Sequence, residues 1–204
     1  FSESIQLNAP VTEVCDTPQG VKITQQGKTQ LFDGVVLACH SDQALNMLTQ
    51  PRDDQRKVLS AVPYLKNHVV LHQDTSLMPS ETRCWAAWNY RLQNQRTDAP
   101  ILTYWMNELQ CMPAQTPDFF VTVNPDGRID PAKILREFEY AHPQFGPESP
   151  AAQAKLAEVN RHSKIVLGGA WARNGFHEDG HLAGLEAAAS LIETLDDTHH
   201  AESA

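Results

Sequence analysis

The sequence predicts an α+β fold in which a mostly antiparallel sheet is flanked by strand–helix pieces of a second domain. Two short apolar runs, 35–39 and 164–167, are each followed by a polar or glycine-containing loop and then by residues at helical spacing. Continuous apolar runs of this kind are typical of parallel strands that are covered on both faces. Between them, alternating segments succeed one another without a long helix, which indicates antiparallel strands.

This pattern divides the chain into four expected parts. Residues 1–50 are a partial nucleotide-type domain with a hairpin, a buried strand and a helix, and residues 51–160 form an inserted domain. Residues 161–195 return to the first domain with its C-terminal strand and helix. Residues 196–204 are expected to be a disordered tail.

The first part begins with extended pieces at 4–7 and 11–15, and continues with a hairpin that turns at Gln26-Gly27. A helix is expected through Ala44 to Leu48, after the apolar strand and the polar triplet His40-Ser41-Asp42.

In the inserted part we expect four strands and then a helix. The helix should begin at Asp130-Pro131, because aspartate is a preferred N-cap and proline a preferred first helical residue, and it should carry Ile134, Leu135 and Phe138. A short helix around 151–159 leads into the strand at Lys164. The expected strands are 66–73, 83–91, 101–109 and 119–123.

Composition excludes several classes of protein. The net charge is −9 and the basic residues are scattered, so neither nucleic acid nor an anionic membrane is an expected partner. No apolar run reaches the roughly 20 residues of a membrane span. The cysteines at 15, 39, 84 and 111 form no CxxC pair, so we expect free, mostly buried thiols in a cytoplasmic protein.

The segment His177-Glu178-Asp179-Gly180-His181 matches the HExxH pattern of zinc proteases. That chemistry needs both histidines inside a helix, one turn apart on the same face. Here Asn174-Gly175 stands just upstream and a glycine interrupts the motif, so the segment is predicted to be a loop and the first turn of a helix. No third ligand follows, and we expect no metal site.

The inserted part is rich in aromatic residues, and such a density of rings suits the wall of an apolar substrate pocket. An ordinary aromatic core is the alternative, and it is the more frequent case for any single ring. The residues concerned are Trp85, Trp88, Tyr90, Tyr104 and Trp105.

Gly168-Gly169 ends the second apolar strand, and a helix is predicted to begin near Asp179-Gly180. Glycines let the backbone approach a ligand closely, and a helix N-terminus carries partial positive charge. A reduced flavin, which develops negative charge at one edge of its ring, would be stabilised there. Tight helix–strand packing without any ligand explains the same glycines equally well.

The stretch GAWARNGFHEDGHLAGLEAA, residues 169–188, resembles the C-terminal flavin motif of the FAD-dependent amine-oxidase-like oxidoreductases. More narrowly, it is similar to a bacterial subgroup of NAD/FAD-binding proteins with GAW…GFHEDG near the C-terminus. The resemblance extends over nearly the whole chain, through the segments 33–40, 69–74, 77–79, 84–90 and 140–143.

The resemblance implies noncovalent FAD, redox chemistry at the flavin N5, and a two-domain fold with a Rossmann-like FAD-binding domain. It places Val11 and Val14 by the adenine, Gly169 and Ala170 beside the phosphates and ribityl chain, and Gly180, His181 and Leu182 facing the isoalloxazine. The chain departs from the family pattern at two positions. Ala170-Trp171 stands where the family often has an acidic residue, so Glu178 or Asp179 is expected to contact the ribityl chain instead. His181 stands where the subgroup usually has a leucine-like residue, which puts a direct role for His181 in doubt. His177 is the candidate catalytic polar group near the ring, although a histidine that merely caps the next helix is more frequent.

The GxGxxG dinucleotide fingerprint is absent, and the chain starts at Phe1 without methionine. We therefore expect the C-terminal part of a longer FAD-dependent oxidoreductase, with FAD absent from this chain alone. The strands at Val35 and Lys164 should then have unpaired edges, which could pair across a homodimer. The alternative function is a non-catalytic module that binds an apolar ligand on its aromatic sheet. A small molecule is the expected substrate, either an amine or an unsaturated acyl chain.

Overall fold

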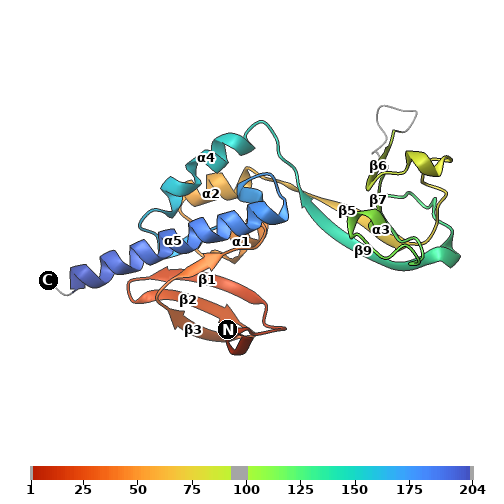
Figure 1. Ribbon diagram of the computed structural model, residues 1–204. Coiled ribbons are helices and arrows are strands. Elements are labelled where there is room, and N and C mark those ends of the chain that lie inside the picture. Colours follow the sequence, from red (N-terminus) through yellow and green to blue (C-terminus); the bar gives the residue numbers. More distant parts are fainter. Residues whose placement is uncertain (1, 93–100, 203–204) are drawn as a thin grey trace. The chain divides into compact units, whose positions relative to one another are not determined.

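The computed structural model describes residues 2–92 and 101–202 (Figure 1). The chain forms two compact units, the first made of Phe1–Tyr64 with Pro143–Ala204 and the second of Leu65–His142. Helices at 53–60 and 149–160, in the part that the sequence analysis assigned to the inserted domain, lie in the first unit. In the described part of the chain no helix is both long and apolar enough to cross a membrane.

The strands of the first unit form two sheets. The antiparallel sheet has the order β1 (Val11–Thr17), β2 (Gly20–Gln25), β3 (Lys28–Phe32), and β2 and β3 form the predicted hairpin. The second sheet pairs β4 (Val35–Leu37) with β10 (Ile165–Leu167) in parallel, as the two apolar runs indicated. The expectation for residues 4–7 was wrong, because a 3-10 turn, η1 (Ser2–Ser4), and a bend replace the extended piece.

Helices cover these sheets, and their apolar residues form the core of the first unit (Figure 1). They are α1 (Ser41–Met47), α2 (Asp53–Ser60), α4 (Ser149–Asn160) and α5 (His177–Glu202), with a 3-10 turn η4 (Ala170–Ala172) before α5. Leu59, Leu167 and Trp171 are among the buried side chains of this core. The expected disordered tail was wrong as far as Glu202, because α5 continues to that residue and the Thr198 hydroxyl donates to the Thr194 carbonyl one turn earlier.

The second unit is a five-stranded sheet with the order β6-β7-β8-β5-β9 (Figure 1). The pairings β6–β7, β7–β8 and β8–β5 are antiparallel, which confirms the α+β fold with a mostly antiparallel sheet. The strands are β5 (Tyr64–His72), β6 (Trp88–Arg91), β7 (Ile101–Trp105), β8 (Phe120–Val123) and β9 (Ile134–Pro143), and the short helices are η2 (Thr82–Cys84), α3 (Met106–Leu109) and η3 (Pro131–Lys133).

The helix predicted from Asp130 is the main error. Asp130 does accept a hydrogen bond from the Ala132 N–H group at 3.0 Å, but only the 3-10 turn η3 follows. The chain then becomes β9, because Ile134–Pro143 pairs with β5 at the edge of the sheet, where the ion pairs Lys66–Glu139 and His68–Glu137 join the two strands. Local capping residues therefore identified a turn and not a helix.

Two predicted strands are shorter than expected. The strand expected at 83–91 begins only at Trp88, after η2, and the strand expected at 101–109 ends at Trp105, where α3 begins. All four cysteines are free, but Cys84 lies exposed in η2 and Cys111 is also exposed, so the expectation of mostly buried thiols was wrong.

The outer edge of β10 is closed by side chains. Ile165 and Leu167 point their N–H and C=O groups away from β4, because the carbonyl of Lys164 and the N–H of Gly168 bond to β4. Ser163 Oγ bonds to both groups of Ile165 (3.2 and 2.7 Å), and the Asn160 amide bonds to both groups of Leu167 (2.9 and 2.8 Å). In the described structure no strand pairs with this edge, as expected, but its backbone groups are bonded by side chains and are not open to another chain.

A buried polar network fixes the second unit. His72, fully buried, bonds through Nε2 to Thr122 Oγ1 at 2.7 Å, and Thr122 bonds to Thr103 at 2.9 Å, so the network joins β5, β8 and β7. His72 Nδ1 accepts the Asp74 N–H group, which makes the ring neutral, and burial lowers the pKa of His72.

Asp74 joins the loop after β5 to η3. Burial alone would raise the pKa of Asp74, but hydrogen bonds from the N–H groups of Asp130 and Ser76 and from the Lys133 ammonium outweigh burial and lower it from 3.8 to about 2. The carboxylate is thus stabilised in its charged form.

The second unit should lose stability in acid through this carboxylate. A carboxyl group whose pKa is lowered on folding stabilises the fold above its unfolded pKa, and this contribution disappears as the pH falls from 3.8 towards 2. The shift corresponds to roughly 2 kcal/mol of unfolding free energy. Urea unfolding between pH 5 and pH 2 should show this loss for the parent protein and a flatter profile for Asp74→Asn. The separate loss from His72, which begins below its unfolded pKa as pH falls, should remain in the variant. Equal slopes below pH 4 in both proteins would contradict the assignment.

Candidate functional site

The carboxyl ends of β4 and β10 meet in the first unit, and ligands of open parallel sheets bind at such strand ends. The Gly168 N–H group donates to the Leu37 carbonyl at 3.0 Å, and the buried Trp171 indole donates to the Cys39 carbonyl at 3.1 Å. The loop after β4 and the glycine turn after β10 are thereby held side by side.

Gly169 has a conformation that other residues rarely adopt, with φ +127° and ψ 169°. A Cβ atom at this position would lie 3.1 Å from the Trp171 ring and 3.2 Å from the Cys39 carbonyl oxygen. The turn therefore has no room for a side chain at position 169. The Gly168 position is similarly tight, since its Cβ would lie 3.3 Å from Ala187 of α5.

The N-terminus of α5 packs against this turn. A Cβ at Gly180 would lie 3.7 Å from the Ala170 Cβ, and the Asp179 carboxylate accepts the Phe176 N–H group at 3.0 Å. Asp179 thus caps the helix, while His177, Glu178, His181 and Leu182 are exposed. The motif His177 to His181 lies wholly within the start of α5, so the expectation that part of it is a loop and that the helix begins near Asp179-Gly180 was wrong. Among the described residues no group of three or more His, Cys, Asp or Glu side chains could hold a metal ion.

His40 and Tyr64 belong to the same strand end and were not predicted as site residues. Their rings are stacked with centroids 4.4 Å apart, the Tyr64 hydroxyl accepts the Ser41 N–H group at 3.0 Å, and burial raises the pKa of Tyr64. His40 Nδ1 is shielded from solvent and makes no hydrogen bond in the part of the chain that the structure describes, and the Asp42 carboxylate lies 4.0 Å from it. The sequence feature that could have identified His40 as a site residue is the polar triplet His40-Ser41-Asp42, which directly follows an apolar strand.

The two residues that the resemblance assigned to the adenine lie in β1. The Val14 side chain is buried in the core, and its carbonyl accepts the Thr49 N–H group at 3.1 Å. Val11 is half-buried and packs against the same core.

The sheet of the second unit separates the five predicted pocket rings into two groups. Trp85 and Trp105 meet edge to face at 5.3 Å, and Trp85 also contacts the buried Phe120. Trp88 and Tyr90 point to the opposite face with Tyr104, since Trp88 pairs with Tyr104 and their rings lie 5.4 Å apart. Of these five rings, only Trp88 and Tyr90 are largely open to solvent, and Tyr104 is half-buried.

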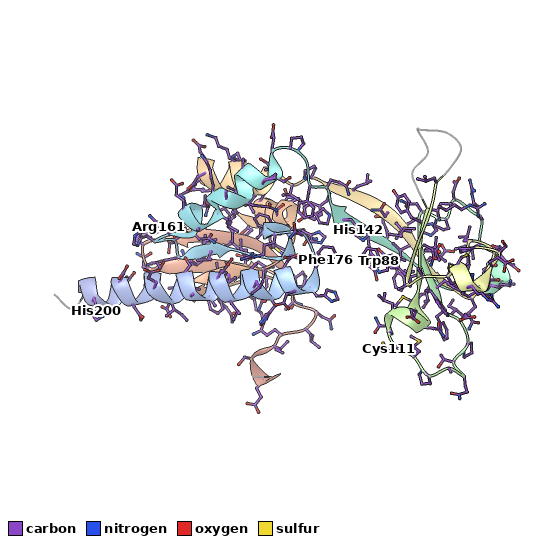
Figure 2. All side chains as sticks on the ribbon, turned by 45° about the horizontal axis from the view of Figure 1, so that its top comes forward. Trp88, Cys111, His142, Arg161, Phe176 and His200 are labelled. Carbon is purple, nitrogen blue, oxygen red and sulfur yellow. The ribbon has the colours of Figure 1, made fainter. Side chains whose placement is uncertain are left out.

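The opposite face continues across the sheet onto β9. Asn67 bonds to His142 at 2.9 Å, and the Tyr140 ring lies between those of His142 and Phe138. Sequence reasoning missed Phe138 and Tyr140 because it placed Phe138 in a helix. We call this surface the aromatic face; it consists of Asn67, Val69, Leu71, Trp88, Tyr90, Leu102, Tyr104, Val121, Val123, Arg136, Phe138, Tyr140 and His142. Figure 2 shows where Trp88 and His142 lie in the second unit.

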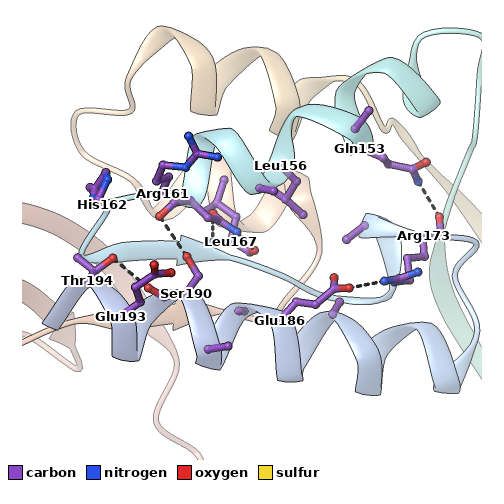
Figure 3. Close-up of a pocket in the computed structure, with 17 residues that line it drawn as sticks. Gln153, Leu156, Arg161, His162, Leu167, Arg173, Glu186, Ser190, Glu193 and Thr194 are labelled. Atoms are coloured by element: carbon purple, nitrogen blue, oxygen red, sulfur yellow. Dashed lines mark hydrogen bonds and ion pairs between the residues drawn. The ribbon is translucent and has the colours of Figure 1, made fainter. Parts of the chain in front are cut away.

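A cavity of about 700 Å³ lies between α4 and α5 in the first unit (Figure 3). Alanines line much of it, Arg173 pairs with Glu186 across it, and the Gln153 amide bonds to the Arg173 carbonyl. None of the predicted site residues lines this cavity.

Solved structures of enzymes share the fold of this chain. Cyclohexylamine oxidase from Brevibacterium oxydans IH-35A matches with a TM-score of 0.60 at 12% identity, over 96% of this chain and 50% of that one. A fatty acid isomerase from P. acnes that produces CLA matches with a TM-score of 0.56 at 14% identity, over 86% and 46%. An engineered mutant of putrescine oxidase matches with a TM-score of 0.57 at 10% identity, over 91% and 48%.

The chain therefore has an amine-oxidase-like fold, and it spans about half the length of these structures. No family model and no curated protein matches its sequence.

Proposed function

We propose that this chain is part of a longer FAD-dependent, amine-oxidase-like oxidoreductase, to which it contributes one portion of the FAD-binding domain and the substrate domain. The observation that carries the proposal is the fold: 96% of the chain matches half of cyclohexylamine oxidase. The flavin-like motif at 169–188 supports it independently, because its glycine turn and helix lie at the ends of two parallel strands.

The residues at these strand ends fit a flavin dinucleotide. The Gly169 turn is held tightly by Trp171 and the Cys39 carbonyl at the ends of both strands, and His40 Nδ1 makes no hydrogen bond in the described residues. The first turn of α5 adds N–H groups and partial positive charge. In this proposal Gly168, Gly169 and Ala170 hold the ribityl and phosphate part, while Gly180, His181 and Leu182 face the isoalloxazine. Glu178 contacts the ribityl chain, since Asp179 is engaged by Phe176.

FAD when bound supplies the hydride acceptor. In the second unit, the aromatic face binds an apolar substrate and excludes water from it. In the first unit, the exposed His177 is the proposed polar group near the isoalloxazine. Tight binding of the pyrophosphate needs a glycine-rich βαβ unit. We propose that this unit extends the sheet at β4, because in the described structure β10 is closed by side chains and no strand lies beyond β4.

The longer protein should contain about one FAD per chain, whereas residues 1–204 alone should retain none. The absorbance near 450 nm and the flavin released on denaturation measure this directly, and His177→Ala in the longer protein tests the polar contact through the rate of flavin reduction. A colourless longer protein that gains no flavin on incubation with FAD would contradict the proposal. That result would favour the alternative, a non-catalytic module whose exposed aromatic face binds an apolar ligand.

A further inference from the structure

We propose that the aromatic face binds a long acyl chain with an anionic head, and that Arg136 contacts the head. This inference names the substrate class and rests on the proposed function. Its evidence is the chemistry of the second unit, taken by itself.

Large aromatic side chains of the aromatic face are exposed to water, although burying them would be favourable. Trp88, Tyr90 and Tyr140 are 54%, 61% and 48% exposed. Aliphatic side chains of two central strands lie between ring clusters on both sides: Val121 and Val123 on β8 and Leu71 on β5 are half-buried, and Val69 on β5 is buried. Exposed apolar patches of this kind mark binding surfaces. An extended hydrocarbon chain that crosses the sheet would contact the rings of β9, then the aliphatic strip, and then the rings of β6 and β7.

Charges on this face select against an amine. No strand residue that the structure describes on the aromatic face carries a carboxylate. The acidic residues of β9 bond to the even-numbered side chains of β5, away from Asn67, through the pairs Lys66–Glu139 and His68–Glu137. An ammonium group placed on the aromatic face would gain cation–π contacts but no counter-ion, whereas an anionic head gains the Arg136 guanidinium.

Arg136 favours a ligand with an anionic head. Its guanidinium lies over the Phe138 ring, 5.9 Å from the centroid, which places it on the aromatic face at the β9 edge. Its guanidinium makes no ion pair with a carboxylate of the described residues. A guanidinium held against a ring is well suited to a carboxylate or a phosphate.

The dimensions agree with a chain that crosses the sheet. Five strands spaced about 4.8 Å apart give a width of roughly 19 Å from β9 to β6, which is comparable to an extended fatty acyl chain. At the β6 end, Trp88 and Tyr90 also line a cavity of about 500 Å³ with Leu77 and Met78. The lining residues of that cavity include no carboxylate, but they include Arg91 and Asn89, so the cavity adds a second cation at the β6 end of the face.

The test uses the longer protein and cis-parinaric acid, a fatty acid whose fluorescence rises in an apolar environment. Binding should be displaced by oleate and not by oleylamine, which has the same chain with an ammonium head. Arg136→Gln should weaken parinarate binding about tenfold, the loss of one charge-assisted contact, and Trp88→Ala should weaken it as well. Arg56→Gln on α2 is the control, and Arg91→Gln tests the other arginine near β6.

Each outcome decides a separate point. Displacement by oleylamine as effective as that by oleate, or equal losses in Arg136→Gln and Arg91→Gln, would overturn the proposal. If phosphatidylglycerol vesicles displace parinarate and free oleate does not, the anionic head belongs to a lipid; the reverse identifies a free acid. Flavin content is measured in the same samples, so a colourless protein with Arg136-dependent parinarate binding would contradict the proposed function and still support the acyl site.

Discussion

Asn160→Ala is expected to lower the unfolding free energy by roughly 2–5 kcal/mol. The Asn160 side chain is buried at the end of α4 and bonds to both backbone groups of Leu167 in β10. Its removal leaves a buried N–H and a buried C=O without partners, and each such group costs about 1–3 kcal/mol. No backbone strand lies at this edge in the described structure to replace the amide. Urea unfolding followed by far-UV circular dichroism measures the change.

Gln153→Ala is the matched control on the same helix. The Gln153 amide also bonds to backbone, donating to the carbonyls of Trp171 and Arg173 at 2.9 and 2.6 Å, but its side chain is half-exposed. Water can replace the lost donor, so a loss under about 1 kcal/mol is expected. If Asn160→Ala and Gln153→Ala destabilised the protein equally, the closure of β10 by side chains would have no energetic importance.

The sequence was informative where local pattern and final environment agree. The hairpin at Gln26-Gly27 follows from its turn residues, and the parallel pairing of β4 with β10 follows from two continuous apolar runs. The segment after Asp130 shows the limit: its capping residues and the apolar residues Ile134, Leu135 and Phe138 favoured a helix, while its place beside β5 made it a strand. Pairing with a distant strand overrides a local start signal, and local spacing does not reveal it.

The site residues that sequence reasoning missed depend on contacts between distant segments. Phe138 and Tyr140 join the aromatic face only because β9 pairs with β5, and the stacking of His40 on Tyr64 joins residues that no sequence motif connects. The closure of β10 likewise depends on the position of the end of α4 relative to the next strand. By contrast, the Gly168-Gly169 turn and the existence of α5 were predicted, because glycine spacing and helix periodicity are local signals.

Gly169→Ala is expected to destabilise the first unit by about 3 kcal/mol or more and to abolish flavin retention in the longer protein. A backbone with φ +127° and ψ 169° is essentially restricted to glycine and costs other residues about 1–3 kcal/mol. The added Cβ would also meet the Trp171 ring and the Cys39 carbonyl at 3.1 and 3.2 Å. Relief of these contacts would separate the β4 and β10 loops, and with them the two halves of the proposed flavin site.

The control for this prediction is Gly27→Ala in the hairpin turn. Gly27 also has a positive φ, +73°, but a Cβ there would meet nothing within 4 Å, so only a backbone cost of about 1 kcal/mol is expected. Urea unfolding measures stability in both variants, and absorbance near 450 nm measures flavin in the longer protein. Normal flavin content in Gly169→Ala would show that the glycine turn does not contact the cofactor, and stability equal to that of Gly27→Ala would show that the turn relaxes without cost.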